Sequence, residues 1–89
     1  MKAIITVIGK DTVGIIAKVS SKCAQYNVNI SDITQKVFRD TFAMIMMVEI
    51  ENINIQFSEF VDIMESAGKE MGVVIKTMHE DLFNSMHRI

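Results

Sequence analysis

The sequence predicts a single α+β domain in which strands and helices follow one another in the order β-α-β-β-α-β, with a short helix at the end. Three observations favour this. Strand-like and helix-like hydrophobic patterns alternate along the chain, and no proline interrupts them. The chain has 89 residues, close to the about 100 that one hydrophobic core uses. We therefore expect one domain that spans residues 1–89.

The first strand is predicted from Lys2 to Ile8, where apolar and β-branched residues run without a break up to Gly9. Such a run is typical of a strand that is buried on both faces. We expect this strand to lie in the middle of its sheet and to end at Gly9.

The first helix follows a short polar loop and is predicted to extend over about 14 residues. Asp11 or Thr12 can cap its start, and the turn-prone Asn27 marks its end. Apolar or small residues recur at steps of three and four, which predicts one buried face. That face comprises Val13, Ile16, Val19, Ser20, Cys23 and Tyr26.

Two further strands are predicted to form a hairpin. The segment 29–38 alternates between its two sides, Arg39 and Asp40 form a tight turn, and the segment 41–50 follows. Residues 42–48 of the second strand are all apolar. Neither face of that strand is therefore expected to contact water.

The second helix shows the clearest periodicity in the chain. Asn54 or Ser58 can cap it, and Gly72 can stop it. A strand over 73–79 and a terminal helix over 80–89 complete the chain. The apolar positions of the second helix are Phe57, Phe60, Val61, Met64, Ala67 and Met71, and those of the terminal helix are Leu82, Phe83, Met86 and Ile89.

This order is the split βαβ pattern of ferredoxin-like domains. It predicts a two-layer sandwich in which two helices cover one face of a four-stranded antiparallel sheet. The other face then needs cover from the terminal segment or from another subunit, because exposed apolar sheet surface promotes aggregation. The second strand is expected at an edge, where it can pair with its symmetry mate. This predicts a homo-oligomer, a dimer joined into one continuous sheet.

The composition excludes several classes of partner. Hydrophobic residues make up 49% of the chain and the net charge is −2, so neither a nucleic acid nor an anionic membrane is attracted by the overall field. The opening apolar run is shorter than that of a signal peptide, and no later segment approaches a membrane span. We expect a cytoplasmic protein that binds no nucleic acid and no membrane.

Residues that could carry catalysis are sparse. Gly9 and Gly14 have the spacing of half a phosphate-binding loop, but Ile15 and Ile16 stand where Lys and Ser or Thr are needed. The lone Cys23 cannot form an internal disulfide and is expected in the core. The only two histidines lie near the C-terminus, away from any activated nucleophile. We predict no catalytic residue, no metal and no cofactor, and therefore no enzyme.

The glycine-bounded loop still has the geometry of an anion site. Free N–H groups at the start of the following helix favour a carboxylate or another small anion. The spacing alone does not distinguish such a site from a plain capped connection, so both interpretations stay open.

Residues 9–35 resemble an ACT domain, the small regulatory module of many enzymes of amino-acid metabolism. The pattern is an Asp-x-x-Gly loop at Asp11 and Gly14 that opens a Gly-Ile-Ile-Ala helix, followed by the Asn-Ile step of Asn29 and Ile30. The chain length and element order are similar to single-domain proteins of the UPF0237 group. They are also similar to the ACT repeats of the glycine cleavage system transcriptional repressor.

The resemblance implies a small amino acid held between two subunits. The N–H groups of Gly14 and Ile15 would bind its carboxylate, Asp11 would face its ammonium, and Asn29 would reach in from the neighbouring subunit. The implied site residues are Asp11, Thr12, Val13, Gly14, Ile15, Asn29 and Ile30. The chain departs from the pattern at Val13, where many members have Pro, and at Gly9, where some have a His ligand.

Two functions follow as hypotheses. The first is a non-enzymatic regulatory protein that senses a small amino acid or related metabolite between subunits and acts on a partner enzyme or regulator. The alternative is a protein-interaction or scaffold module without a small-molecule ligand.

Overall fold

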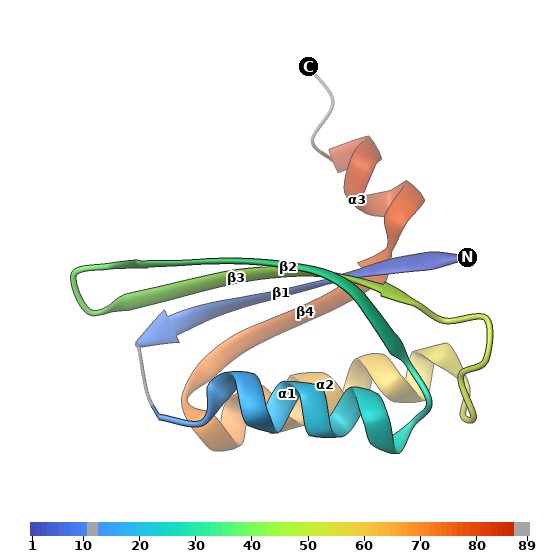
Figure 1. Ribbon diagram of the computed structural model, residues 1–89, viewed down its shortest axis with the longest axis horizontal. Helices are drawn as coiled ribbons and strands as arrows, with labels where there is room; N and C mark the ends of the chain where they lie inside the picture. The colour runs from blue at the N-terminus through green and yellow to red at the C-terminus, as the bar shows by residue number, and fades with distance from the viewer. Residues whose placement is uncertain (11–12, 87–89) are drawn as a thin grey trace.

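The computed structural model describes residues 1–10 and 13–86. These residues form four strands and three helices; the sheet and two of the helices make two layers, and the third helix stands clear of both (Figure 1). The order confirms the predicted one. The elements are β1 (Lys2–Lys10), α1 (Ile15–Gln25), β2 (Asn29–Phe38), β3 (Thr41–Glu49), α2 (Phe57–Met71), β4 (Val73–His79) and α3 (Glu80–Met86).

The four strands form one antiparallel sheet in the order β2-β3-β1-β4. β1 and β3 are central, as predicted for β1, and β2 and β4 are the edges. Across the middle of the sheet, Thr6 of β1 lies beside Ile45 of β3 and Lys76 of β4, and Ile45 in turn lies beside Thr34 of β2. This arrangement confirms the ferredoxin-like α+β fold.

One face of the sheet packs on α1 and α2 and forms the hydrophobic core. Alternate residues of each strand point into it, because side chains on a strand alternate between faces. Methionines fill part of this core, since Met44, Met46 and Met64 are almost fully buried. The core includes Ala3, Ile5, Val7, Val19, Cys23, Phe42, Val48, Phe60 and Ile75.

The buried face of α1 agrees with the predicted one at Val19 and Cys23 and differs from it at the start of the helix. Ile15, Val19 and Cys23 are buried at steps of four, whereas Val13 is fully exposed and Ile16 is exposed. The reason is the start of the helix. Gly14 occupies the N-cap with a left-handed backbone (φ 90°), so Val13 precedes the helix and the helix has 11 residues. The predicted capping residues Asp11 and Thr12 lie outside the described residues.

Gly9 does not end β1, contrary to the prediction. The strand continues to Lys10 and pairs Gly9 with Val73 of β4. A Cβ at Gly9 would stand 2.6 Å from Cγ1 of Val73, so the glycine allows a close approach of β1 to β4 rather than a turn.

The second half of the chain follows its prediction more closely. α2 ends at Gly72, whose left-handed backbone (φ 76°) closes the helix. Its N-cap is Gln56 rather than Asn54 or Ser58. Instead, the Asn54 Nδ2 donates a hydrogen bond to the carbonyl of Gln25, which ties the loop before α2 to the end of α1.

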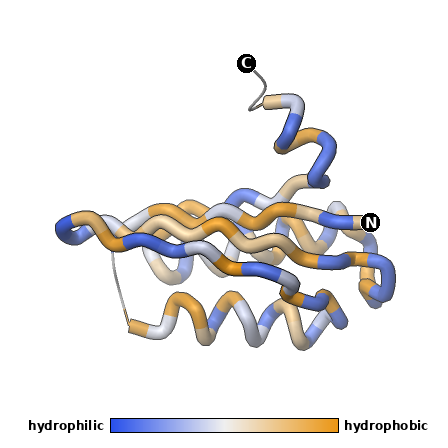
Figure 2. Tube along the Cα trace, turned by 45° about the horizontal axis from the view of Figure 1, so that its top comes forward, coloured by the Kyte–Doolittle hydropathy of each residue, from blue (hydrophilic) through white to orange (hydrophobic). Residues whose placement is uncertain are grey.

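Within one chain, the terminal helix leaves part of the second face of the sheet open. On β1 only Ala3, Ile4, Ile5 and Val7 are buried, and of these Ile4 alone lies on the face away from α1 and α2. Ile45 of β3, on the same face, is 46% exposed. α3 rises away from this face instead of lying across it (Figure 1), and none of its described residues is buried. Apolar residues recur along the strands (Figure 2), and Ile8, Ile45 and Val74 among them are exposed.

None of the helices in the described part of the chain is long and apolar enough to span a membrane.

Candidate ligand site

The start of α1 forms one half of the predicted site. Gly14 accepts a hydrogen bond from the amide of Lys18 through its carbonyl, and the first turn of α1 holds no acidic residue. The first N–H groups of a helix lack intrahelical acceptors and carry partial positive charge. The backbone of Ile15 therefore lies where a small anion is favoured, beside the exposed Val13. Asp11 and Thr12, also predicted here, lie outside the described residues.

Asn29 and Ile30 form the other half, and the structure does not bring them to the first half within one chain. They begin β2, just after the C-terminal end of α1. An 11-residue helix is about 16 Å long, so the length of α1 separates Asn29 from Gly14 (Figure 1).

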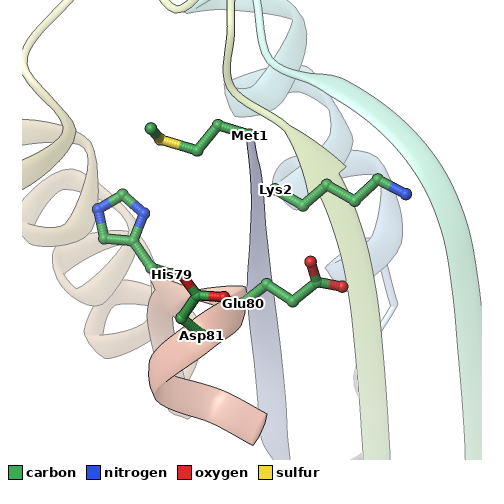
Figure 3. Close-up of a pocket in the computed structure, with 5 residues that line it drawn as sticks. All are labelled: Met1, Lys2, His79, Glu80 and Asp81. Carbon is green, nitrogen blue, oxygen red and sulfur yellow. The ribbon is translucent and has the colours of Figure 1, made fainter.

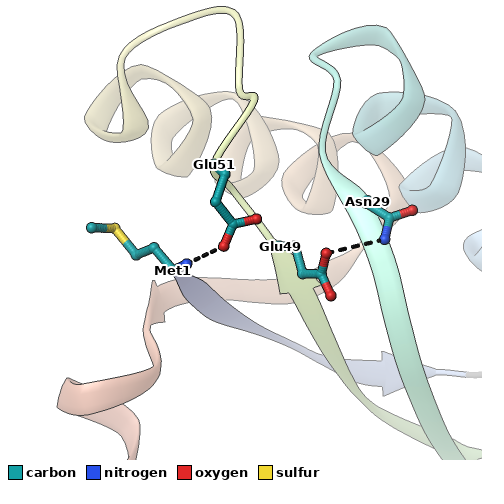
Figure 4. Close-up of polar contacts among 4 residues, drawn as sticks. All are labelled: Met1, Asn29, Glu49 and Glu51. Atoms are coloured by element: carbon teal, nitrogen blue, oxygen red, sulfur yellow. Dashed lines mark hydrogen bonds and ion pairs between the residues drawn. The ribbon is translucent and has the colours of Figure 1, made fainter.

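Asn29 has a weak partner within its own chain. Its Nδ2 donates a hydrogen bond to the Glu49 Oε1 at 3.5 Å. The N-terminal amine of Met1 forms an ion pair with Glu51 at the same end of the sheet (Figure 4). The hydrogen bond that the N-terminal amine of Met1 donates to Glu51 holds the pKa of the exposed Glu51 carboxyl below its usual value. Asn29 itself is exposed and is available to a second chain.

The free edge of β2 lies next to these groups. β2 pairs only with β3, and every described residue of β2 except Ile30 is exposed. Ile33 and Val37 lie opposite the buried Met46 and Phe42, so they sit on the helix side of the sheet, yet they are 39% and 51% exposed. The edge of this sheet therefore offers both unpaired backbone groups and apolar side chains.

A polar cavity that the sequence reasoning missed lies at the end of β4. It has a volume of about 370 Å³ and is lined by Met1, Lys2, His79, Glu80 and Asp81 (Figure 3). The pairing of β1 with β4 brings the N-terminus to this segment, and no local pattern signals such a pairing. The His79 ring packs on Phe57 with ring centroids 4.2 Å apart, which holds it against α2.

The described residues do not assemble a metal centre at this cavity. They contain no group of three or more His, Cys, Asp or Glu side chains placed to hold a metal ion. Cys23 lies elsewhere, fully buried in the core, and burial raises the pKa of its thiol to about 11. A protonated buried thiol is a poor nucleophile, which confirms Cys23 as a core residue.

Comparisons with known proteins agree with the fold and the pattern. A family model described as ACT domain matches residues 2–77. The UPF0237 protein of Methanosarcina acetivorans is 48% identical over 86 residues, covering 97% of this chain and 94% of its own length. The solved ACT domain protein from Streptococcus pneumoniae is 38% identical, covers 98% of each chain and superposes with a TM-score of 0.81.

A more distant structure shares the fold alone. A protein assigned as a glycine cleavage system transcriptional repressor is 22% identical and superposes with a TM-score of 0.69, over 85% of this chain and 43% of its own.

Proposed function

The chain belongs to the ACT domain family, within its UPF0237 group, and we propose that it is a non-enzymatic ligand sensor. In this proposal a small amino acid or a related metabolite binds at a site that two copies share. The separation of Gly14 from Asn29 by the length of α1 carries the proposal, because one chain cannot close a small-molecule site from both halves.

Antiparallel pairing of two β2 edges supplies the missing half. Such a pair has a two-fold axis perpendicular to the sheet, so the first residue of one β2 lies beside the last residues of the other. The start of α1 and the hairpin end of β2 lie at the same end of the molecule (Figure 1). The partner's Asn29 would thus approach Gly14 and Ile15 of the first copy.

The roles of the residues follow from charge. The amides of Gly14 and Ile15, at the positive end of α1, bind the carboxylate, and Asp11 binds the ammonium group. Asn29 of the partner subunit, with Thr12, Val13 and Ile30, completes the wall. Charge-assisted hydrogen bonds of this kind contribute about 1.5 to 3 kcal/mol each when they are sheltered from water, and the second chain provides the shelter.

The ligand contacts no side chain at position 9 in this proposal. Gly9 is packed against Val73, so this position has no room for the His ligand that some family members carry. Recognition of the ligand therefore depends on the backbone of the loop and on Asp11 and Asn29.

A second candidate function is a protein-interaction module without a small-molecule ligand. The exposed apolar side chains of Ile33 and Val37 on the β2 edge favour it, since they would pack against any added strand. In this case the pairing of two β2 edges remains, and the start of α1 is only a capped connection between β1 and the helix. In both cases we propose that the protein acts in the cytoplasm on a partner enzyme or regulator.

Ligand-dependent thermal unfolding distinguishes the two functions. A binding amino acid raises stability by RT ln(1 + [L]/Kd), about 2.7 kcal/mol at one hundred times Kd. A panel of the twenty amino acids should contain at least one that raises the Tm of the protein, and Asp11→Ala or Asn29→Ala should abolish the rise. Asn84→Ala, an exposed amide on α3, is the control. Unchanged melting curves across the panel favour the interaction module.

A further inference from the structure

The outer face of the sheet, the face away from α1 and α2, is covered unevenly within the chain. Ile4 of β1 is 2% exposed, whereas Ile8, on the same face of the same strand, is 55% exposed. α3 packs on β1 and β4 and stands upright from the outer face where β4 ends (Figure 1). The half of the face that holds Ile8 lacks an equivalent helix among the described residues.

An apolar groove of about 340 Å³ lies between α3 and this open half of the sheet. The strands form its floor and α3 forms one wall. Apart from the hydroxyl group of Thr6, the side chains that line it are apolar, which favours an apolar group as its occupant. They include Thr6, Ile8, Ala43 and Ile45 from the sheet and Phe83 and Met86 from α3.

Two lysines lie where this groove opens towards the β2–β3 hairpin. Lys36 of β2 is paired with Ala43, and Lys10 comes two residues after Ile8 on β1, so both side chains belong to the outer face. Both are exposed, and neither forms an ion pair with another described residue. The apolar floor therefore ends at two cations that no carboxylate of the described chain neutralises by contact.

The other charges near this end do not alter that balance. Arg39 and Asp40 of the hairpin turn carry opposite charges. Lys76 of β4 also belongs to the outer face, but its Nζ lies 3.5 Å from the carboxylate of Glu65 on α2. Lys10 and Lys36 are therefore the cations that remain for a ligand.

The opposite end of the outer face is acidic. Asp32 and Glu49 lie on this face, and Glu80 and Asp81 begin α3, against Lys2 as the one lysine there. An anion is thus repelled at the end where α3 begins and attracted at the hairpin end. This asymmetry gives an elongated anionic molecule one preferred direction in the groove.

We propose that the groove binds an amphipathic carboxylate, a small molecule with an aliphatic or aromatic tail and one carboxylate group. The tail lies on Ile8 and Ile45, against the α3 wall, and the carboxylate points to the hairpin end near Lys10 and Lys36. Burial of the tail supplies most of the affinity, because ion pairs with exposed lysines contribute little. The lysines set the direction of binding and the sign of the head group.

The size of the groove favours a small molecule over a protein. Its volume of about 340 Å³ lies near the lower end of the range of ligand pockets, roughly 300 to 1,000 Å³. A specific protein interface needs about 800 Å² on each partner. Here the apolar floor is short, because α3 stands at one end of it (Figure 1) and Lys10 and Lys36 lie at the other.

This site is separate from the proposed amino-acid site. The groove lies on the face of the sheet away from α1, whereas the amino-acid site uses the start of α1 and Asn29. The tail is also the part of the ligand that a small amino acid lacks. Either site can therefore exist without the other.

Three probes that share one tail test the proposal on the full chain. Octanoate, octanol and octylammonium are titrated into the isotope-labelled protein, and amide shifts are followed by NMR. Octanoate should give saturable shifts at Ile8, Ala43 and α3 and should bind more tightly than octanol, with octylammonium weakest. Each CH₂ group removed from octanoate should weaken binding about fourfold. Equal affinities for the three probes, or no saturable shift at the groove, would overturn the proposal.

Substitutions separate the tail from the head group. Lys10→Gln and Lys36→Gln should each weaken octanoate about twofold to fivefold and leave octanol unchanged. Lys69→Gln, at an exposed position of α2, is the control and should affect neither probe. If Lys10→Gln and Lys36→Gln bind octanoate as tightly as the unaltered protein, the proposed head-group position is wrong.

The tail position is tested at two sites on opposite sides of the groove. Ile45→Glu should abolish the binding of both octanoate and octanol. Ile45 is 46% exposed, so the variant should fold, which circular dichroism checks. Met86→Ser, on the exposed side of α3, should weaken both probes and provides the measurement if Ile45→Glu unfolds. Unchanged binding in Met86→Ser together with unchanged binding in a folded Ile45→Glu would contradict the proposal.

The same measurements identify other occupants of the face. Sedimentation with phosphatidylglycerol vesicles should show no binding, and sedimentation velocity should give Ile45→Glu the same assembly mass as the unaltered protein. Vesicle binding without octanoate binding would make a membrane the occupant. A halved mass for Ile45→Glu with unmoved groove signals would make a second copy the occupant. Octanoate shifts at Gly14 and Asn29 in place of the groove would assign the carboxylate to the amino-acid site. Each of these three results would overturn the groove proposal, and the last would leave the amino-acid site standing.

Discussion

Gly9 of β1 lies so close to Val73 of β4 that an added Cβ would stand 2.6 Å from Cγ1 and 2.9 Å from Cα of Val73. The backbone of Val73 cannot move aside without disturbing the pairing of the two strands. This contact explains why a glycine is needed inside a regular strand, where it otherwise weakens the structure.

We expect Gly9→Ala to destabilise the fold by about 1 to 3 kcal/mol, the cost of overpacking a close contact. Urea unfolding, monitored by circular dichroism, measures this loss of stability. Val74→Ala, at the neighbouring and exposed position of β4, is the control and should change stability far less. A Gly9→Ala variant as stable as the unaltered protein would show that β4 can shift.

Gly14→Ala should also destabilise the protein, but for a different reason. A Cβ at Gly14 meets no atom within 4 Å, whereas its φ of 90° lies in the left-handed region. The expected cost is backbone strain of about 1 kcal/mol. Gly14→Asn should cost less than Gly14→Ala, since Asn tolerates this conformation better. The urea unfolding midpoints of Gly14→Ala and Gly14→Asn test this order of stability. Equal midpoints for the two variants would contradict it.

Cys23 should make stability depend on pH in the alkaline range. Burial raises the pKa of its thiol from 9.0 to about 11 in the folded chain, so the unfolded chain loses the proton first. The contribution of the protonated thiol to stability is complete below pH 9 and is lost as the pH rises towards 11. Cys23→Ala should be less stable at pH 7, through lost packing, and should show a weaker fall between pH 9 and 11.

Thiol labelling provides an independent measurement on Cys23. A thiol reagent at pH 8 should react slowly with the native protein and rapidly after addition of urea, because the side chain is fully buried. Fast labelling of the native protein would contradict both the burial and the raised pKa.

Thr77→Val should leave stability unchanged or raise it by up to about 1 kcal/mol. The Thr77 Oγ1 is buried without a hydrogen-bond partner among the described residues, on the core side of β4. Valine has the same shape without the polar atom. Thermal unfolding checks this, with Thr6→Val as the comparison at a half-buried position. A clear fall in Tm for Thr77→Val would show that the hydroxyl has a partner in solution.

The sequence predicted most of the local structure because local patterns carry it. The bounds of β2 and β4, the Arg39 and Asp40 turn and the Gly72 stop of α2 were all predictable. Arg39 has a positive φ of 60°, as a tight hairpin turn requires. On α1, Val19 and Cys23 are buried as predicted, but Val13 and Ile16 are exposed, because hydrophobic spacing gives the period of a helix and not the residue at which a left-handed Gly14 starts it.

The candidate site was predictable only in part. A one-dimensional pattern predicted a site at Gly14, Ile15, Asn29 and Ile30, but it could not show that the two pairs lie at opposite ends of α1. The cavity beside His79 had no local signal at all, since strand pairing brings its two segments together.

The sequence by itself determined the order of strands and helices, the family, and the amount of apolar surface, because these depend on residue types at short spacing. Only the tertiary structure decided which surface stays uncovered. Whether Ile8 is buried depends on where α3 stands relative to β1 and β4, and that position follows from packing between segments about 75 residues apart. The same packing leaves a β2 edge that a second chain can complete and an apolar groove beside α3.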